Sequence, residues 1–381
     1  MSAIDDENVT DATVHPEDLE AADPALRPKM LADFIGQTEV TENLRVYIEM
    51  ARKRGQSLDH VLLFGPPGLG KTTLAQIIAN ELYYEFRPTA APAIAKPGDM
   101  AALLLGLEPW SVLFIDEIHR LNKVAAEMLY TAMEDFHIDL LVGEGVDTKS
   151  MRMDVPPFTL IGATTRPGML PGPLRDRFGI QCRMEFYSNE ELSSILERTS
   201  ELMAIAGEID AFREIARCSR GTPRIAKRLL RRIRDHAEYE GSEAISLEAA
   251  VNGLARLRID QNGLNEQDRR YLGQILKAFG CGPVGLETLA ASLSEDPDIL
   301  EVQVEPYLME LGLIQRTPRG RVLTDNGCLL AAQGGAAQGG AIPGRARSVP
   351  AAAQAGSPAK RVGAASSGLG RQPELRLFDS P

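Results

Sequence analysis

The sequence reads Gly65-Pro66-Pro67-Gly68-Leu69-Gly70-Lys71-Thr72 directly after the apolar run His60-Val61-Leu62-Leu63-Phe64. The first segment has the Gly-x-x-x-x-Gly-Lys-Thr pattern of a phosphate-binding loop. Its context is the one that the pattern needs, because the apolar run predicts a buried strand and residues 71–82 are expected to form a helix. We therefore expect this loop to bind the phosphates of a nucleotide.

The residues of this loop have distinct expected roles. Gly68 and Gly70 let the backbone approach the phosphate oxygens, and the helix that follows directs its N–H donors toward the anion. Lys71 is expected to neutralise the β and γ phosphates. The Thr72 hydroxyl is expected to complete a Mg²⁺ shell, and Thr73 to support the α phosphate.

Two acidic residues follow a second apolar run, Ser111-Val112-Leu113-Phe114-Ile115. Asp116 ends this expected strand, as the acid of a Walker B motif does, and is expected to hold Mg²⁺ through water. Glu117 is then placed to orient or deprotonate the attacking water. The acidic pair therefore predicts hydrolysis of the bound nucleotide.

A third apolar run, Phe158-Thr159-Leu160-Ile161-Gly162, is followed by two threonines. Thr164 or Thr165 is expected to sense the γ phosphate, and the pattern leaves open which of them does so. Threonine at a strand end also reflects β propensity alone. The three apolar runs do not alternate and are separated by helices, which is typical of a parallel sheet covered on both faces. We predict a doubly wound α/β domain over residues 26–182.

The rest of the chain divides by composition and spacing. Residues 183–258 lack strand runs and show helical spacing, which predicts a small all-α domain. Residues 259–330 contain three expected helices and then two short strands around Thr317-Pro318-Arg319-Gly320, the pattern of a winged helix. The acidic segment 1–25 and the Ala- and Gly-rich segment 331–381 are expected to be disordered.

Charge and cysteine content restrict the class of protein. The formal net charge is −12, but residues 1–25 carry eight acids and no Lys or Arg, so the remaining chain carries −12 + 8 = −4. A local basic patch, and not this total, decides whether DNA binds. The four cysteines form no Cys-x-x-Cys pair, which predicts separate reduced thiols and no zinc site. With no secretory segment and no membrane-spanning run in the sequence, the expected location is the cytoplasm.

Several motifs together resemble the RuvB family of AAA+ ATPases, the bacterial motors that drive Holliday-junction branch migration. The resemblance covers residues 26–330 and implies an AAA+ domain, an all-α lid and a winged helix. The phosphate-binding loop and the acidic pair are common to all AAA+ proteins, whereas three other segments are more specific. They are Asp116-Glu117-Ile118-His119-Arg120-Leu121, Gly162-Ala163-Thr164-Thr165-Arg166-Pro167 and Arg316-Thr317-Pro318-Arg319-Gly320-Arg321.

The resemblance implies further residues at the ATP site. Arg177 matches the arginine finger that reaches the nucleotide of the neighbouring subunit, and Arg175 lies beside it at the same interface. Arg224 matches the sensor 2 arginine of the lid. Three positions match the lining of the adenine pocket: Leu26, Arg27 and Tyr187. Three more lie near the nucleotide rim: Glu134, Asp135 and Phe136.

The resemblance also implies a DNA contact and a protein contact. Arg316 and Arg321 match winged-helix residues that touch the DNA backbone, and a wing with three arginines is a small phosphate-binding surface. Residues 137–157 are expected to form a hairpin whose apolar pair, Met151 and Met153, binds a RuvA-like junction-binding protein. The alternative is a hairpin packed on its own core.

The expected function is that of an ATP- and Mg²⁺-dependent homohexameric motor that branch-migrates Holliday junctions on double-stranded DNA. It would act with the RuvA-like partner, and with a resolvase, in homologous recombination and DNA repair. A clamp-loader-type AAA+ switch without translocation is the alternative, which the wing and the hairpin disfavour. A DNA-binding regulator with a degenerate ATPase would need a broken active site, whereas the key polar residues are present.

The last residues of the chain carry one further pattern. Glu374-Leu375-Arg376-Leu377-Phe378 resembles the short Leu-x-Leu-Phe peptides that bind the groove of the bacterial sliding clamp. The first Gln of that pattern is Glu here, and short matches also arise by chance. The hypothesis is a clamp contact through Leu375, Leu377 and Phe378 at the end of a flexible tether.

Overall fold

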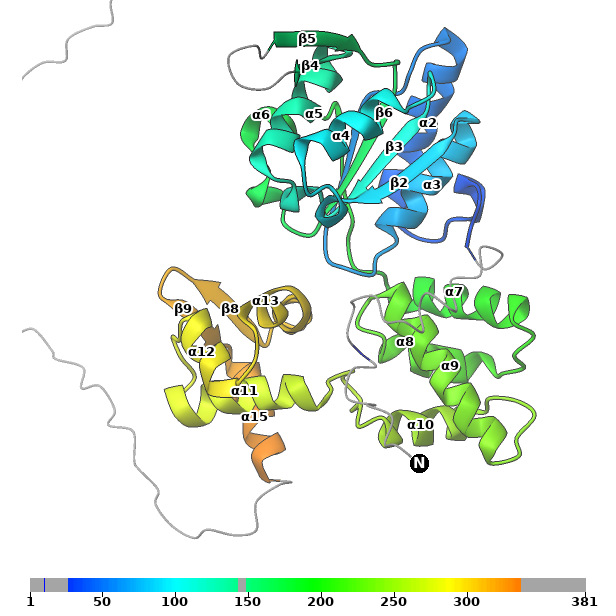
Figure 1. The fold of residues 1–381 in the computed structure, drawn as a ribbon. Helices are drawn as coiled ribbons and strands as arrows, with labels where there is room; N and C mark the ends of the chain where they lie inside the picture. Colours follow the sequence, from blue (N-terminus) through cyan, green and yellow to red (C-terminus); the bar gives the residue numbers. More distant parts are fainter. Residues whose placement is uncertain (1–9, 11–26, 143–148, 337–381) are drawn as a thin grey trace, which may run out of the picture. The chain divides into compact units, whose positions relative to one another are not determined.

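The computed structural model describes residue 10 and residues 27–142 and 149–336 (Figure 1). Four predictions fall on residues outside this range. They concern Leu26 in the adenine pocket, the acidic segment apart from residue 10, the Ala- and Gly-rich segment from residue 337 onward, and the sliding-clamp contact of Leu375, Leu377 and Phe378. These remain predictions.

The first region is a five-stranded parallel sheet in the order β2-β3-β6-β1-β7, flanked by helices (Figure 1). The strands are β1 (Val61–Phe64), β2 (Phe86–Ala90), β3 (Val112–Asp116), β6 (Thr159–Thr164) and β7 (Ile180–Arg183). The α-helices are α2 (Thr38–Arg54), α3 (Lys71–Leu82), α4 (Pro97–Leu105), α5 (Lys123–Asp135) and α6 (Gly172–Arg175). Short 3-10 turns are η3 (Leu31–Asp33), η4 (Ala91–Ala93), η5 (Ile118–Arg120) and η7 (Pro167–Met169).

Alternate residues of the central strands pack on opposite faces of this sheet. In β1, Val61 and Leu63 belong to the core under α2 and α3, whereas Leu62 belongs to the core under α4 and α5. All three side chains are fully buried. Burial on both faces explains the unbroken apolar run, because neither face of the strand meets water. The prediction of a doubly wound α/β fold is confirmed.

The edge strand β2 was not predicted from the sequence. Its residues, Phe86-Arg87-Pro88-Thr89-Ala90, are exposed or half-buried and include a proline, which lacks an N–H for a second neighbour. Proline is tolerated at a sheet edge for that reason. An edge strand of this kind carries neither an apolar run nor a clear alternation, so its pairing with β3 is visible only in the folded structure.

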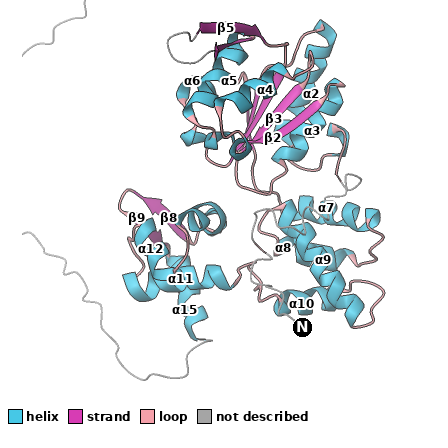
Figure 2. Ribbon diagram, in the orientation of Figure 1, coloured by secondary structure: helices cyan, strands magenta, loops and turns pink. Residues whose placement is uncertain are grey.

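A helical region follows, made of α7 (Asn189–Leu202), α8 (Ile209–Arg217), α9 (Pro223–Tyr239) and α10 (Leu247–Arg256). The start of α7 has a capping box, in which the Ser188 hydroxyl accepts from the Glu191 N–H and the Glu191 carboxylate accepts from the Ser188 N–H. Such reciprocal bonds satisfy two donors that a helix start otherwise leaves free. Figure 2 shows strands in the sheet, in one hairpin beside it and in the C-terminal region, and none in α7–α10.

The C-terminal region has its own buried core, which includes Tyr271, Leu272 and Leu308. Its elements are α11 (Glu266–Phe279), α12 (Leu286–Leu293), α13 (Pro297–Ile299), the π-helical turn η8 (Leu300–Val304), α14 (Glu305–Glu310), β8 (Ile314–Thr317), β9 (Gly320–Leu323) and α15 (Asp325–Ala336). Helices followed by the antiparallel pair β8–β9 are the predicted winged helix. Helix α15 continues into the segment that the sequence assigned to the disordered tail.

The cysteines differ from the expectation of four separate thiols. Cys281 and Cys328 are joined by a disulfide, with their Cα atoms 6.3 Å apart. Cys182 and Cys218 are free and buried, and burial raises the pKa of each thiol to about 11. The prediction is therefore wrong for the first pair. Across the described part of the chain, none of the helices combines the length and apolar character needed to cross a membrane.

Candidate active site

The topology brings three chain segments together at one edge of the sheet. Strand β6 lies between β1 and β3, and all three run parallel. Their carboxyl ends therefore meet, which is where ligands bind in open α/β sheets. The loop 65–70 follows β1, Asp116 ends β3, and Thr164 ends β6.

The loop after β1 is held close to neighbouring backbone. Gly65 has φ 147°, and a Cβ there would lie 2.4 Å from the Met184 carbonyl oxygen, so a larger residue cannot fit. Gly68 and Gly70 also have positive φ, 79° and 95°. Glycine adopts this conformation without steric cost, which lets the loop turn and feed directly into α3. The conformation suits a loop whose N–H groups surround an anion.

Lys71 is folded back into its own loop. Its Nζ donates hydrogen bonds to the carbonyl oxygens of Gly65 (2.9 Å) and Pro66 (2.8 Å), and the side chain is buried. Burial lowers the pKa of Lys71 to about 8, while the nearby carboxylates of Glu117 and Asp116 oppose that shift. An anionic phosphate in the loop would favour the charged ammonium.

Asp116 and Glu117 lie at the end of β3 as predicted. Asp116 Oδ1 accepts the Glu117 N–H at 2.9 Å, and Glu117 adopts a left-handed conformation with φ 48°. Burial raises the pKa of Asp116, and the adjacent Glu117 carboxylate raises it further. A half-buried carboxylate pair of this kind favours a cation nearby.

The two threonines at the end of β6 have different partners. The Thr165 hydroxyl donates to Glu117 Oε2 at 3.2 Å. The Thr164 hydroxyl is fully buried, accepts the Arg166 N–H at 3.0 Å and lies 2.9 Å from His119 Nδ1. Thr165 is therefore the threonine in contact with the acid expected to activate water.

His119 belongs to the site, although the sequence predicted no role for it. Its Nδ1 lies 3.1 Å from Glu117 Oε2, and burial lowers its pKa. It lies two positions after Glu117 in the turn η5, which brings its ring back toward the end of β3. Its position within the family-specific motif at residues 116–121 was the signal in the sequence that could have assigned it to the site.

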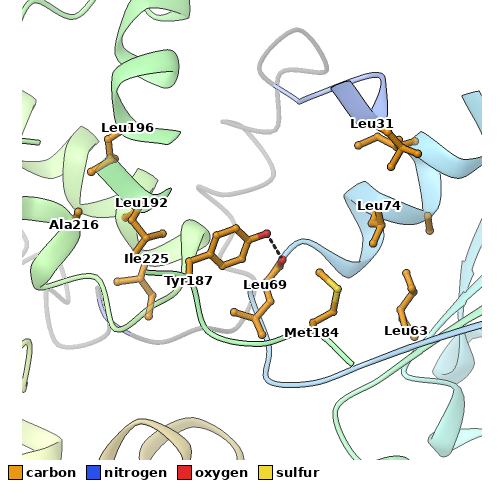
Figure 3. Close-up of a cluster of buried hydrophobic side chains, with 14 of the residues drawn as sticks. Leu31, Leu63, Leu69, Leu74, Met184, Tyr187, Leu192, Leu196, Ala216 and Ile225 are labelled. Atoms are coloured by element: carbon orange, nitrogen blue, oxygen red, sulfur yellow. Dashed lines mark hydrogen bonds between the residues drawn. The ribbon is translucent and has the colours of Figure 1, made fainter. Parts of the chain in front are cut away.

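A cavity lies beside the loop and next to the helical region. Five residues that line it are Arg27, Phe34, Thr73, Tyr187 and Lys227. The Tyr187 hydroxyl donates to the Leu69 carbonyl oxygen at 3.1 Å (Figure 3). The structure thus brings two of the three predicted adenine-pocket residues, Arg27 and Tyr187, to one cavity.

Lys227 and Arg198 also line this cavity and were not identified from the sequence. Burial lowers the pKa of Lys227 to about 8, and the nearby Arg198, Arg231 and Arg27 lower it further. Lys227 lies three residues after Arg224 in α9, so helical spacing places the two on neighbouring positions of one face. That spacing was the signal that would have found Lys227.

The three predicted arginines occupy different places. Arg224 lies in the first turn of α9, near enough to act electrostatically on Lys71 and Asp116. Arg177 instead contacts α5: its Nη2 donates to the Tyr130 hydroxyl at 2.8 Å and pairs with Glu134 Oε1 at 2.5 Å. Its guanidinium also lies over the Tyr130 ring, 4.9 Å from the centroid.

Arg175 ends α6, two residues before Arg177, and its exposed side chain lies 4.0 Å from Asp176.

The residues expected near the nucleotide rim lie at the end of α5. Glu134 pairs with Arg177, Asp135 is exposed, and Phe136 caps the helix with its ring edge-on to Phe158 at 6.3 Å. None of the three is among the residues lining the cavity that contains Tyr187. Within one chain, therefore, Glu134 is a partner of Arg177, and none of the three residues lines the base pocket.

The hairpin expected to bind a partner is formed by β4 (His137–Val142) and β5 (Lys149–Asp154), outside the main sheet (Figure 1). Met151 is 51% exposed. Met153 pairs with the fully buried Ile138 and packs against the domain core. Met153 is thus half-buried where the hairpin covers the core, whereas Met151 is exposed, and the binding of a partner by this pair stays a prediction.

The wing residues lie on β8 and β9, where Arg316 and Arg321 are directly opposite each other. Arg319 is exposed at the turn between the strands. Arg316 and Arg321 both pair with Glu305 within the C-terminal region.

Comparisons with known proteins agree along the chain. The Holliday junction DNA helicase RuvB P-loop domain matches residues 26–184, the RuvB AAA lid domain matches 187–260, and the RuvB C-terminal winged helix domain matches 261–330. These matches follow the order of the three structural regions.

Individual relatives are similar over most of their length. The Holliday junction branch migration complex subunit RuvB of Rhodospirillum centenum is 56% identical over 308 residues, 81% of this chain and 85% of that protein. The protein of the same name from Paramagnetospirillum magneticum is 56% identical over 320 residues, 84% of this chain and 92% of that protein. The solved structure of the Thermotoga maritima RuvB Holliday junction branch migration motor has a TM-score of 0.73 and 48% identity, and covers 79% of this chain and 96% of that one. The chain therefore belongs to the RuvB family of P-loop ATPases.

Proposed function

We propose that this chain is the ATP-driven motor of Holliday-junction branch migration, acting with a RuvA-like junction-binding protein in recombination and repair. The observation that carries the proposal is the Glu117 carboxylate, which lies beside the phosphate-binding loop and is contacted by Thr165 and His119. The winged helix and the named relatives favour a motor over a clamp-loader-type switch.

Asp116 and Thr72 are the residues that would hold Mg²⁺. The donors fit this ion, because a carboxylate at the end of β3 and a hydroxyl in the first turn of α3 are hard oxygen ligands. Two protein ligands suffice, since Mg²⁺ keeps several waters and binds substrate phosphates. When bound, the ion neutralises charge on the phosphates.

Hydrolysis would use residues already oriented in the folded chain. Lys71 lies in the loop with its ammonium directed at loop carbonyls, which a phosphate would replace as partners. Glu117 would orient or deprotonate the attacking water, and Thr165 would connect Glu117 to the γ phosphate. Arg224 would act from the lid on the negative charge of the γ phosphate, since it already acts electrostatically on Lys71 and Asp116.

The active site would be completed by a neighbouring copy in a homohexamer. Arg177 contacts Tyr130 and Glu134 on α5, whereas Arg224 is a cation of the same chain that acts on Lys71. This placement supports a role for Arg177 at the nucleotide of another subunit. The neighbouring Glu134, Asp135 and Phe136 would then approach the nucleotide rim from the same side.

Mixing two inactive variants tests this arrangement. We expect Arg177→Ala and Lys71→Ala proteins each to lose ATPase activity, because each lacks one half of the composite site. Mixed rings should regain part of the activity, since some interfaces pair an intact loop with an intact Arg177. The measurement is ATPase rate against mixing ratio, with each variant alone as control. Absence of recovery in rings shown to be mixed would argue against action between subunits.

The outer part of the β4–β5 hairpin is the expected contact for the junction-binding partner. We expect Met151→Asp to weaken binding of the RuvA-like protein roughly tenfold or more, because the variant would place a charge where the Met151 side chain becomes buried against the partner. Val46→Asp is the matched control: Val46 is 56% exposed on α2, against 51% for Met151. Binding is measured by isothermal titration with the purified partner. Equal affinity of Met151→Asp and the parent protein would remove the hairpin from the interface.

Branch migration of a synthetic four-way junction, with and without ATP and the partner, tests the function as a whole. A motor converts the junction to duplex products only when ATP is present. A clamp-loader-type switch would bind and hydrolyse ATP but leave the junction unmoved. That result would replace the proposed function with the alternative.

A further inference from the structure

A fully buried carboxylate lies beneath the two wing strands. Glu305 is the first residue of α14 and has no exposed surface. Its Oε1 accepts the Tyr271 hydroxyl at 2.9 Å and the Arg321 Nε–H at 2.8 Å, and its Oε2 accepts the Arg316 Nε–H at 2.5 Å. Removing a carboxylate from water is costly unless its oxygens are bonded to charged or polar donors. Three donors from three separate elements meet that requirement here.

The shared carboxylate explains how two arginines can occupy opposite positions of a hairpin. Arg316 on β8 is the register partner of Arg321 on β9. Like charges directly opposite each other are unfavourable in an antiparallel pair. Glu305 lies between the two Nε groups and offsets that repulsion. The result is a pair of guanidinium groups held side by side by one buried anion.

Glu305 binds both Nε groups, and Arg316 Nη2 also donates to the Glu301 carbonyl oxygen at 2.8 Å, so Arg316 Nη1 and Arg321 Nη2 are the donors with longer contacts. A guanidinium presents five N–H donors in a rigid planar fork, so binding at Nε fixes the direction of the rest. At the rim, the partly exposed Glu301 carboxylate lies 3.9 Å from Arg316 Nη1 and 3.5 Å from Arg321 Nη2. These longer contacts show that an acidic oxygen can approach the Nη side of both arginines.

We propose that Glu305 is a positioning residue for DNA binding. It holds Arg316 and Arg321 as one unit whose Nη donors bind neighbouring phosphate oxygens of the duplex backbone. The inference rests on the proposed contact of these arginines with DNA. Glu305 itself is buried and does not touch DNA, and it acts through the two arginines. Glu301, at the rim, lies on the Nη side of both arginines and also pairs with Arg166 at 3.2 Å.

The test measures binding of the full-length protein to a linear mixed-sequence duplex over a series of salt concentrations. Each phosphate contact adds about 0.9 to the magnitude of the slope of log K against log salt. Glu305→Gln keeps the size of the side chain but removes the charge that holds both arginines. We expect its slope to fall by about 1.8, the value for two contacts, and its affinity to fall roughly tenfold or more.

Three further variants separate positioning from simple stabilisation of the fold. Tyr271→Phe removes one bond to Glu305 and neither bond to arginine, so its slope should equal that of the parent protein. Glu301→Gln removes the acid at the rim, so its slope should not fall. Adding Glu305→Gln to Arg316→Ala and Arg321→Ala should cause no additional loss of DNA affinity, because Glu305 acts only through those arginines.

Thermal unfolding of each variant identifies the outcomes that contradict the proposal. A lower melting temperature for Glu305→Gln with an unchanged slope would give Glu305 a purely structural role. If Glu305→Gln does not fold, Glu305→Asp replaces it: the charge remains but the shorter side chain cannot reach both arginines, and an unchanged slope again overturns the inference. If Arg316→Ala with Arg321→Ala leaves DNA binding intact, the proposed DNA contact fails and this inference fails with it.

Discussion

Replacing Glu117 with Gln is expected to lower the ATP turnover rate roughly 10²–10⁴-fold, the contribution typical of a positioned acid–base group. Nucleotide binding should persist, because glutamine has the same shape and leaves the loop and Lys71 unchanged. The charge of the Glu117 carboxylate is what the variant removes. In the parent protein, Thr165 donates to Glu117 Oε2, and His119 Nδ1 lies 3.1 Å from the same oxygen. An amide in its place cannot take a proton from the attacking water.

The measurement is single-turnover hydrolysis together with equilibrium binding of a fluorescent ATP analogue. Glu127→Gln is the matched control, since Glu127 is an exposed glutamate on α5 that pairs with Lys123. It should hydrolyse ATP at the parental rate. Turnover of the Glu117 variant within a few-fold of the parent would remove this residue from water activation. Loss of nucleotide binding would instead show that Glu117 supports the shape of the loop.

Replacing Lys71 with Ala is expected to reduce kcat/KM for ATP roughly 10³-fold or more, because a buried charge-assisted contact to the phosphates is lost. Lys71 lies inside the loop and bonds two of its carbonyl oxygens, so the alanine variant also loses contacts that support the empty loop. Lys71→Met separates these effects, since methionine fills much of the same volume without charge.

If the charge of Lys71 makes the main contribution to phosphate binding, Lys71→Ala and Lys71→Met should lose ATPase activity to the same extent. Lys123→Ala serves as the surface control, because the Lys123 side chain is 88% exposed. Steady-state ATPase activity and thermal unfolding are measured on all three proteins. A methionine variant with near-parental activity would show that Lys71 fills space in the loop and does not bind phosphate through its charge.

Much of the architecture was visible in local patterns. Helix α3 was predicted over residues 71–82 and has those bounds, because the phosphate-binding loop directly before it marks its start. The central strands were found because burial on both faces produces unbroken apolar runs. The edge strands β2 and β7 were not predicted. An edge strand needs no unbroken apolar run, and it forms through its pairing with the neighbouring strand, β3 for β2 and β1 for β7.

The same distinction applies to the site. The phosphate-binding loop and the Asp116-Glu117 pair were recognisable because their chemistry needs particular residues in consecutive positions. The roles of the two threonines were not separable, since they are adjacent and chemically alike. Thr165 contacts Glu117, 48 positions earlier in the chain, only because β6 lies beside β3 in the observed register.

The sequence therefore specified the nucleotide chemistry and the family, because both depend on short contiguous motifs. Folding specified the partners of the remaining residues. Met153 packs against the core while Met151 is exposed, because Met153 lies nearer the base of the hairpin and pairs with the buried Ile138. Arg316 and Arg321 share Glu305 because α14 passes beneath the wing. Contacts of this kind join distant segments, and they follow from register and packing that no single segment encodes.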